Sequence, residues 1–183
     1  MKKIALMLMS AFVLNASMAQ KMEATVEVGG APMYATKNII ENAVNSKDHT
    51  TLVAAVKAAG LVGTLEGVGP FTVFAPTNEA FAKLPKGTIE SLVKPENKAT
   101  LTKILTYHVV AGKFDAKAIA QLIKQGGGSA SIKTVSGGTL KASMKGNKLV
   151  LTDEKGGMST VTIKNVYQRN GVIHVIDTVV LPS

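Results

Sequence analysis

Apolar residues recur at helical spacing through the first two-thirds of the chain. Between Ile39 and Val44 the apolar positions fall on one face of a helix, as expected for a helix that packs on a core. A further helix is expected after Pro95, and its apolar face includes His108. Similar patterns predict helices that begin at residues suited to be N-caps, namely Asp48, Thr77, Thr88 and Asp115.

Short apolar runs separated by turn residues replace this pattern in the last third of the chain. Strands are predicted at 71–75, 132–135, 140–144, 149–152, 161–166, 172–176 and 179–181. Asn170-Gly171 is the strongest hairpin signal, and the run 172–176 is apolar on both faces, which predicts a central strand. Because helices and antiparallel strands are segregated along the sequence, the pattern predicts an α+β fold.

The N-terminus has the pattern of a secretory signal peptide, residues 1–19. Lys2 and Lys3 precede an apolar run that ends at Leu14, and small residues lead to a cleavage site after Ala19. The apolar run is shorter than the about 20 residues that span a bilayer, and a buried N-terminal helix is the alternative. Residues 20–35 are expected to form a flexible lead or a loosely docked strand, and residues 36–183 one domain. The mature protein is therefore expected to be secreted or periplasmic, without a membrane span.

The chain is basic, with a formal net charge of +9 that falls to +7 when Lys2 and Lys3 are removed with the leader. Such a charge favours anionic partners such as acidic polysaccharide or cell envelope; scattered lysines that only keep the protein soluble are the alternative. Outside the leader, Arg169 is the single arginine, and aromatic residues make up 4% of the sequence. Grooves that bind nucleic acid use clustered arginine and aromatic side chains, so nucleic acid is not an expected partner.

The sequence contains no recognisable pattern of catalytic or metal-binding residues. Cysteine is absent, which excludes a thiolate metal site, a thiol nucleophile and a lipid-modified cysteine anchor. His49, His108 and His174 lack ligand spacing such as HxH or HExxH, and no GxSxG, P-loop or dinucleotide motif occurs. His174 and Asp177 are close in sequence, but residues three apart on a strand point to opposite faces. We therefore expect no metal, no cofactor and no enzymatic activity.

The Tyr107-His108 pair, at the end of the helix predicted after Pro95, is the candidate binding site. His108 shares a face with Leu101 and Ile104, so its ring is expected to pack on the core while a nitrogen bonds to the backbone. Tyr107 points in another direction and is expected to offer its hydroxyl at a recognition surface. For the pair as a whole, a structural role is favoured over a functional one.

Three segments resemble the signatures of the fasciclin (FAS1) domain family. They are FTVFAPTNEAFAKLP from Phe71, ILTYHVVAGKF from Ile104 and NGVIHVIDTVVLP from Asn170. The resemblance extends from about Asn38 to Pro182. It implies a wedge-shaped, twisted β-sandwich with several helices packed along its edge.

The resemblance also implies a secreted, non-enzymatic module that mediates adhesion to a cell surface or extracellular matrix. In animal members the tyrosine–histidine region, which corresponds to Tyr107 and His108 here, is linked to integrin-type receptors. The integrin link itself is not carried over to this chain, because its signal peptide is of bacterial type and no Arg-Gly-Asp triplet is present. The implied partners are a cell-surface or matrix protein or polysaccharide, with anionic envelope components among them. The alternative function is a periplasmic or extracellular protein that binds a polysaccharide or a small ligand. An enzyme that uses His108 or His174 is a third hypothesis.

Overall fold

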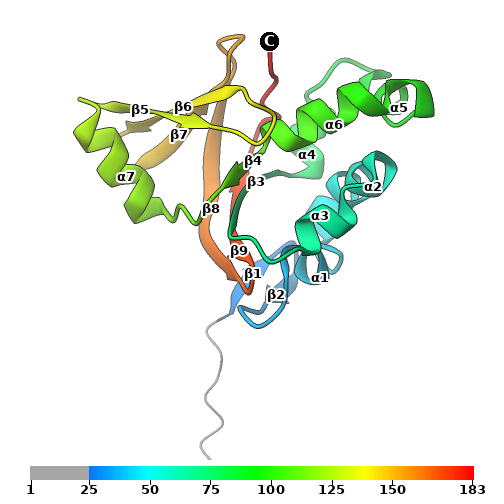
Figure 1. Ribbon diagram of the computed structural model, residues 1–183, viewed down its shortest axis with the longest axis horizontal. Coiled ribbons are helices and arrows are strands. Elements are labelled where there is room, and N and C mark those ends of the chain that lie inside the picture. The colour runs from blue at the N-terminus through cyan, green and yellow to red at the C-terminus, as the bar shows by residue number, and fades with distance from the viewer. Residues whose placement is uncertain (1–24) are drawn as a thin grey trace, which may run out of the picture.

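The computed structural model describes residues 25–183, so the predicted signal peptide lies outside the described residues (Figure 1). The helices are α1 (Ile39–Ala43), the short 3-10 helix η1 (Lys47–His49), α2 (Thr50–Ala59), α3 (Val62–Glu66), α4 (Asn78–Ala82), α5 (Thr88–Leu92), the short 3-10 helix η2 (Pro95–Asn97), α6 (Lys98–Tyr107) and α7 (Ala116–Gln125). The strands are β1 (Val26–Val28), β2 (Ala31–Met33), β3 (Phe71–Pro76), β4 (Val109–Ala111), β5 (Ser129–Lys133), β6 (Thr139–Lys145), β7 (Lys148–Thr152), β8 (Met158–Gln168) and β9 (Gly171–Ile176). Within residues 25–183, no helix is long and apolar enough to cross a membrane.

Seven strands form one mixed sheet in the order β4-β3-β9-β8-β7-β6-β5. β3 and β9 run parallel, and every other neighbouring pair in this sheet is antiparallel. All residues of β9 are buried, since β9 lies between β3 and β8 and both of its faces are covered. The predictions of a central strand at 172–176 and of an α+β fold are confirmed.

The two faces of the central strands pack into different hydrophobic cores. On one face, Val73 and Ile173 join the apolar side chains of helices α1–α6 in the first core. On the opposite face, Phe74 and Ile176 join those of α7 and strands β5–β7 in the second core. This division follows from the alternation of side chains along a strand. The second core contains side chains from β3 and β9 and also from β5–β7, so the sheet curves back on itself and encloses this core together with α7. Helices α1–α6 cover the other side of the central strands (Figure 1).

Side-chain caps fix the start of two of the predicted helices. Thr77 caps α4 and Asp115 caps α7, as predicted, by accepting a hydrogen bond from a backbone N–H of the first turn. The caps predicted at Asp48 and Thr88 were wrong. Asp48 lies inside η1, which delays the start of α2, and Gly87 takes the cap position of α5, so Thr88 is already helical.

The described part of the predicted flexible lead is an ordered hairpin. β1 and β2 pair antiparallel, with Val26 opposite Met33 and Val28 opposite Ala31. Val28 and Met33 are buried in the first core with 1% and 3% of their surface exposed. Of the two expectations for this segment, the docked strand describes these residues and the flexible lead does not, because the apolar side chains of a short hairpin gain enough burial to hold it on the core.

The C-terminal segment crosses the fold without joining the sheet. A strand was predicted at 179–181, but none forms there. The N–H of Val180 donates to Nε2 of His108, and the N–H of Leu181 donates to a carboxylate oxygen of Asp153. These backbone groups are satisfied by side chains, so the segment needs no neighbouring strand.

Candidate functional site

Tyr107 is a buried structural residue at the end of α6. None of its surface is exposed, and its hydroxyl donates to the carbonyl of Thr139 (2.8 Å) and accepts from the N–H of Glu154 (3.2 Å). Burial raises the pKa of Tyr107 to about 12, so the phenol is neutral at physiological pH. The prediction of a hydroxyl at a recognition surface was wrong. The last turn of α6 lies between the two cores, and Tyr107 enters the second while Leu105 packs in the first.

His108 is buried beside Tyr107 and makes the backbone contacts expected of a structural histidine. Its Nδ1–H donates to the carbonyl of Ile104 (2.9 Å), which leaves Nε2 to accept from the N–H of Val180 (3.2 Å). Burial lowers the pKa of His108 to about 4, so the imidazole is neutral. The expected packing of His108 is confirmed, and neither residue of the predicted pair presents a polar atom to a partner.

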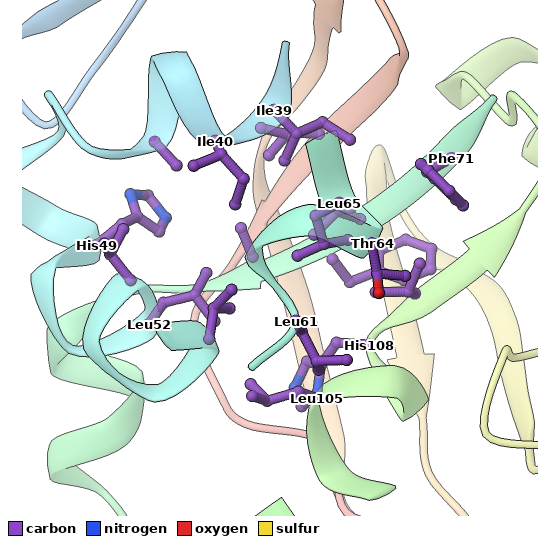
Figure 2. Close-up of a pocket in the computed structure, with 18 of the residues that line it drawn as sticks. Ile39, Ile40, His49, Leu52, Leu61, Thr64, Leu65, Phe71, Leu105 and His108 are labelled. Carbon is purple, nitrogen blue, oxygen red and sulfur yellow. The ribbon is translucent and has the colours of Figure 1, made fainter. Parts of the chain in front are cut away.

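A cavity of about 60 Å³ lies under helices α1, α2, α3 and α6 (Figure 2). Its wall is almost wholly apolar, with the rings of His49 and His108 at its edge. Nδ1 of His49 lies 2.9 Å from Oγ of Ser46, whereas its Nε2 is the one buried side-chain nitrogen or oxygen of residues 25–183 without a hydrogen-bond partner. Burial lowers the pKa of His49, and the carbonyl of Ala75 raises it less strongly, but this carbonyl does not reach hydrogen-bond geometry with Nε2. Since about 10–15 Å³ of such space suffices for one water, the cavity has room for a few waters but not for a sugar or peptide.

The three histidines do not meet at one site. His49 and His108 reach the same cavity from different walls, whereas Nε2–H of His174 donates to the carbonyl of Phe114 on the other side of the sheet (2.8 Å). Burial lowers the pKa of both His49 and His174. No cluster of three or more metal-ligating side chains occurs in the part of the chain that the structure describes.

An open groove of about 670 Å³ lies where α7 faces the start of β7 and the middle of β8. Lys117 of α7, Lys148 of β7 and Lys164 of β8 contribute to its wall, and no acidic side chain among residues 25–183 does. The remaining wall is formed by apolar side chains, Met144 among them, and by threonine and asparagine side chains. We call this feature the lysine groove.

The lysine groove opens because β8 changes partners along its length. Residues Met158–Thr160 pair with β7, whereas β8 pairs with β9 from Val161 onward, with two irregularities of register. Asn165 lies in the second irregularity and has a φ of 61°, the one positive φ of a non-glycine residue in the described chain. Its side-chain oxygen accepts from the N–H of Ala116 (2.7 Å), which holds the start of α7 beside the groove. Bulges and strained residues of this kind are frequent at functional sites.

The groove belongs to a strongly basic part of the molecule, residues 113–164, which we call the lysine-rich lobe. This segment carries nine lysines and three acidic residues, whereas residues 25–112 carry eight lysines and seven acidic residues. All nine lysines are exposed. Asp115, Asp153 and Glu154 instead accept hydrogen bonds from backbone N–H groups. The one salt bridge in residues 25–183, between Arg169 and Glu41 (3.6 Å), lies outside the lobe.

The sequence model of the Fasciclin domain matches residues 47–182. This chain belongs to the fasciclin domain family. A fasciclin domain pair from the insect cell adhesion molecule fasciclin I superposes with a TM-score of 0.72 at 16% identity, over 87% of this chain and 58% of that one. This likeness shows the shared fold and confirms the fold class implied by the sequence.

Relatives of this fasciclin domain occur in bacteria and animals. It is 46% identical over 160 residues to Protein sll1483 of Synechocystis, covering 87% of this chain and 82% of that protein. It is 37% identical over 145 residues to the immunogenic protein MPB70 of Mycobacterium bovis, covering 76% of this chain and 66% of that one. The transforming growth factor-beta-induced protein ig-h3 of Sus scrofa is 35% identical over 148 residues, which are 80% of this chain and 20% of the relative.

Sequence reasoning missed the groove residues of this fasciclin domain. A signal was present, since lysines outnumber acidic residues threefold between 113 and 164. The meeting of Lys117, Lys148 and Lys164 was not visible, because it depends on the change of partners along β8.

Proposed function

We propose that this protein is a secreted, non-enzymatic adhesion module that attaches to an anionic cell surface or extracellular matrix through its lysine-rich lobe. Membership of the fasciclin family supports the adhesive role, and one similar structure is that of a cell adhesion molecule. The signal-peptide pattern of residues 1–19 supports secretion.

The observation that carries the proposal is the uneven distribution of charge. Residues 113–164 hold most of the net positive charge of the mature chain, and their lysines form no salt bridges within the described structure. Exposed, unpaired charges of one sign attract an oppositely charged surface and accelerate association with it. The helical half, residues 25–112, is nearly neutral and offers no comparable attraction.

The buried histidines support a function without catalysis. Both ring nitrogens of His108 and His174 are bonded to backbone groups, so neither ring has a free nitrogen for proton transfer. His49 faces a cavity too small for a substrate of ordinary size. A general base must come within hydrogen-bonding reach of its substrate, and these rings are not placed to do so.

Binding of the purified mature protein to the cells that produce it, and to their isolated envelope, tests the proposal. An unrelated monomeric protein of equal net charge is the control, because it shows how much retention charge alone gives. We expect saturable binding above this control that weakens as salt is raised, since exposed charges are screened. Retention equal to that of the control would exclude an adhesive role.

A further inference from the structure

We infer that the lysine groove binds a segment of an anionic polysaccharide, with its carboxylate or sulfate groups on Lys117, Lys148 and Lys164. The inference rests on the proposed function, and it replaces diffuse attraction to a basic surface with a shaped site. It also moves the binding residues away from Tyr107 and His108, which are buried.

The size of the groove suits a few linked sugar rings. Its volume of about 670 Å³ lies within the roughly 300–1,000 Å³ range of ligand sites. The groove is open rather than enclosed, so a chain longer than the site can enter and leave at its ends. The cavity beside His49, at about 60 Å³, has no such capacity.

The charges in the groove select an anion that carries several separated groups. The three lysines come from three elements, α7, β7 and β8, and each is exposed without a salt bridge in the described structure. No acidic side chain of residues 25–183 lines the groove to offset them. An ammonium group is a point charge on a flexible stem that adapts to carboxylate and sulfate alike. A polymer with one negative charge on each repeat can engage more than one lysine at once, which raises the overall affinity.

The remaining wall favours a sugar chain over an acidic peptide or a nucleic acid. Thr160 and Asn147 supply hydroxyl and amide groups that match sugar hydroxyls, and Ala120 and Met144 supply exposed apolar surface for the C–H face of a sugar ring. No aromatic or arginine side chain among residues 25–183 lines the groove, although single-stranded nucleic acids are bound by stacking on aromatic rings.

The groove is held in shape before any ligand arrives. Asn165 fixes the start of α7 through the N–H of Ala116, and its own N–H donates to Nδ1 of the buried His174 (3.4 Å). A preformed site loses less conformational entropy on binding than a flexible loop does. These two hydrogen bonds distinguish the groove from the lysines scattered over the rest of the lobe.

The test compares two triple variants with equal change of charge. The groove variant is Lys117→Gln, Lys148→Gln and Lys164→Gln. The control variant removes three exposed lysines of the same lobe that do not line the groove: Lys124→Gln, Lys133→Gln and Lys155→Gln. Calorimetry measures binding to polygalacturonate, dextran sulfate, neutral dextran and polyglutamate. Thermal unfolding of each variant checks that the fold is retained.

We expect the unmodified protein to bind one or both anionic polysaccharides and not neutral dextran. The groove variant should lose about tenfold in affinity and the control variant less than about threefold, because direct contacts are lost only in the first. Equal losses in both variants would overturn the groove as the site but leave adhesion by the lobe intact. Equal affinity for polyglutamate would overturn the polysaccharide as its ligand. If the protein binds cells but neither of the two polysaccharides, this inference is overturned and the proposed function stands. If it binds neither the cells nor the polysaccharides, the proposed function is contradicted as well.

Discussion

Asn170 donates a hydrogen bond of 2.7 Å to the carbonyl oxygen of Leu65, which lies 105 residues earlier in the chain. The same amide group donates to the carbonyl of Gly67 (2.8 Å), and its oxygen accepts from the N–H of Ile39 (3.1 Å). One buried side chain thus satisfies the C-terminal end of α3 and the first turn of α1, where helices leave backbone groups unpaired. The asparagine of the NGVIHVIDTVVLP signature acts mainly through its side chain.

Substitution Asn170→Ala should be among the most destabilising single changes in the protein. It leaves two carbonyls and one N–H without partners, at a cost of roughly 3–5 kcal/mol in the free energy of unfolding. Asn45→Ala is the matched control, since the side chain of Asn45 is exposed and makes one hydrogen bond, to the carbonyl of Glu41; its effect should stay within about 0.5 kcal/mol. Urea unfolding measures both, and similar losses in the two variants would contradict the role given to Asn170.

Gly171 is required because the backbone of β3 approaches it closely. A Cβ at this position would overlap the carbonyl of Phe71, so Gly171→Ala should lower the free energy of unfolding by about 2 kcal/mol or more. Gly63→Ala in α3 is the control, because a Cβ there meets nothing within 4 Å; it should be neutral or stabilise by up to about 1 kcal/mol. Thermal unfolding compares the two, and an unchanged midpoint for Gly171→Ala would refute the close approach.

The sequence pattern correctly predicted a hairpin between β8 and β9, but it did not predict the long-range hydrogen bonds of Asn170. The hairpin at Asn170-Gly171 was predicted from the preference of such pairs for tight turns. In the structure Gln168 pairs with Gly171, so the turn is formed by Arg169 and Asn170 instead. A turn propensity depends on neighbouring residues alone, whereas the bonds to Leu65 and Ile39 depend on segments far away in the sequence.

Tyr107→Phe should destabilise the protein without weakening adhesion. The hydroxyl bonds to Thr139 and Glu154 are lost, and an unpaired carbonyl and N–H cost about 1–2 kcal/mol. Tyr34→Phe is the control, since no hydrogen bond involves the Tyr34 hydroxyl in the described structure; it should be nearly neutral. Chemical unfolding and cell binding are measured together. Loss of binding in a folded Tyr107→Phe variant would restore Tyr107 as a contact residue.

Stability should fall as the pH decreases from 7.5 to 5. The pKa of buried His108 is lowered from 6.5 to about 4, so the unfolded chain takes up a proton in this range while the folded protein does not. The contribution of neutral His108 to the free energy of unfolding is therefore fully present above the unfolded pKa and is lost as the pH falls from 6.5 to 4. At pH 5 the loss from His108 alone is about 2 kcal/mol. Burial of His49 and His174 acts in the same direction.

Urea unfolding at several pH values, with His108→Gln for comparison, measures this effect. The variant should show a shallower dependence on pH, because one titrating group has been removed. A free energy of unfolding that does not change between pH 7.5 and 5 would contradict the neutral, buried state of the histidine rings.

The candidate site was less predictable than the fold. Helical periodicity placed His108 correctly on a core-facing side, but the same reasoning placed Tyr107 at the surface, because it assumed one core. Periodicity identifies which residues share a face, whereas the number of cores depends on how the sheet folds. For the same reason the excess of lysine between 113 and 164 indicated a basic region without showing that a groove exists within it.

The most direct test of the adhesive role of the lysine-rich lobe compares two variants that each lose four positive charges. The lobe variant carries Lys117→Gln, Lys133→Gln, Lys148→Gln and Lys164→Gln. The matched variant of the helical half carries Lys57→Gln, Lys86→Gln, Lys94→Gln and Lys98→Gln. Attachment of the producing cells to surfaces coated with each protein is measured at physiological salt. We predict that the lobe variant loses most of the attachment and that the helical variant retains it; equal attachment to the two variants would contradict the account.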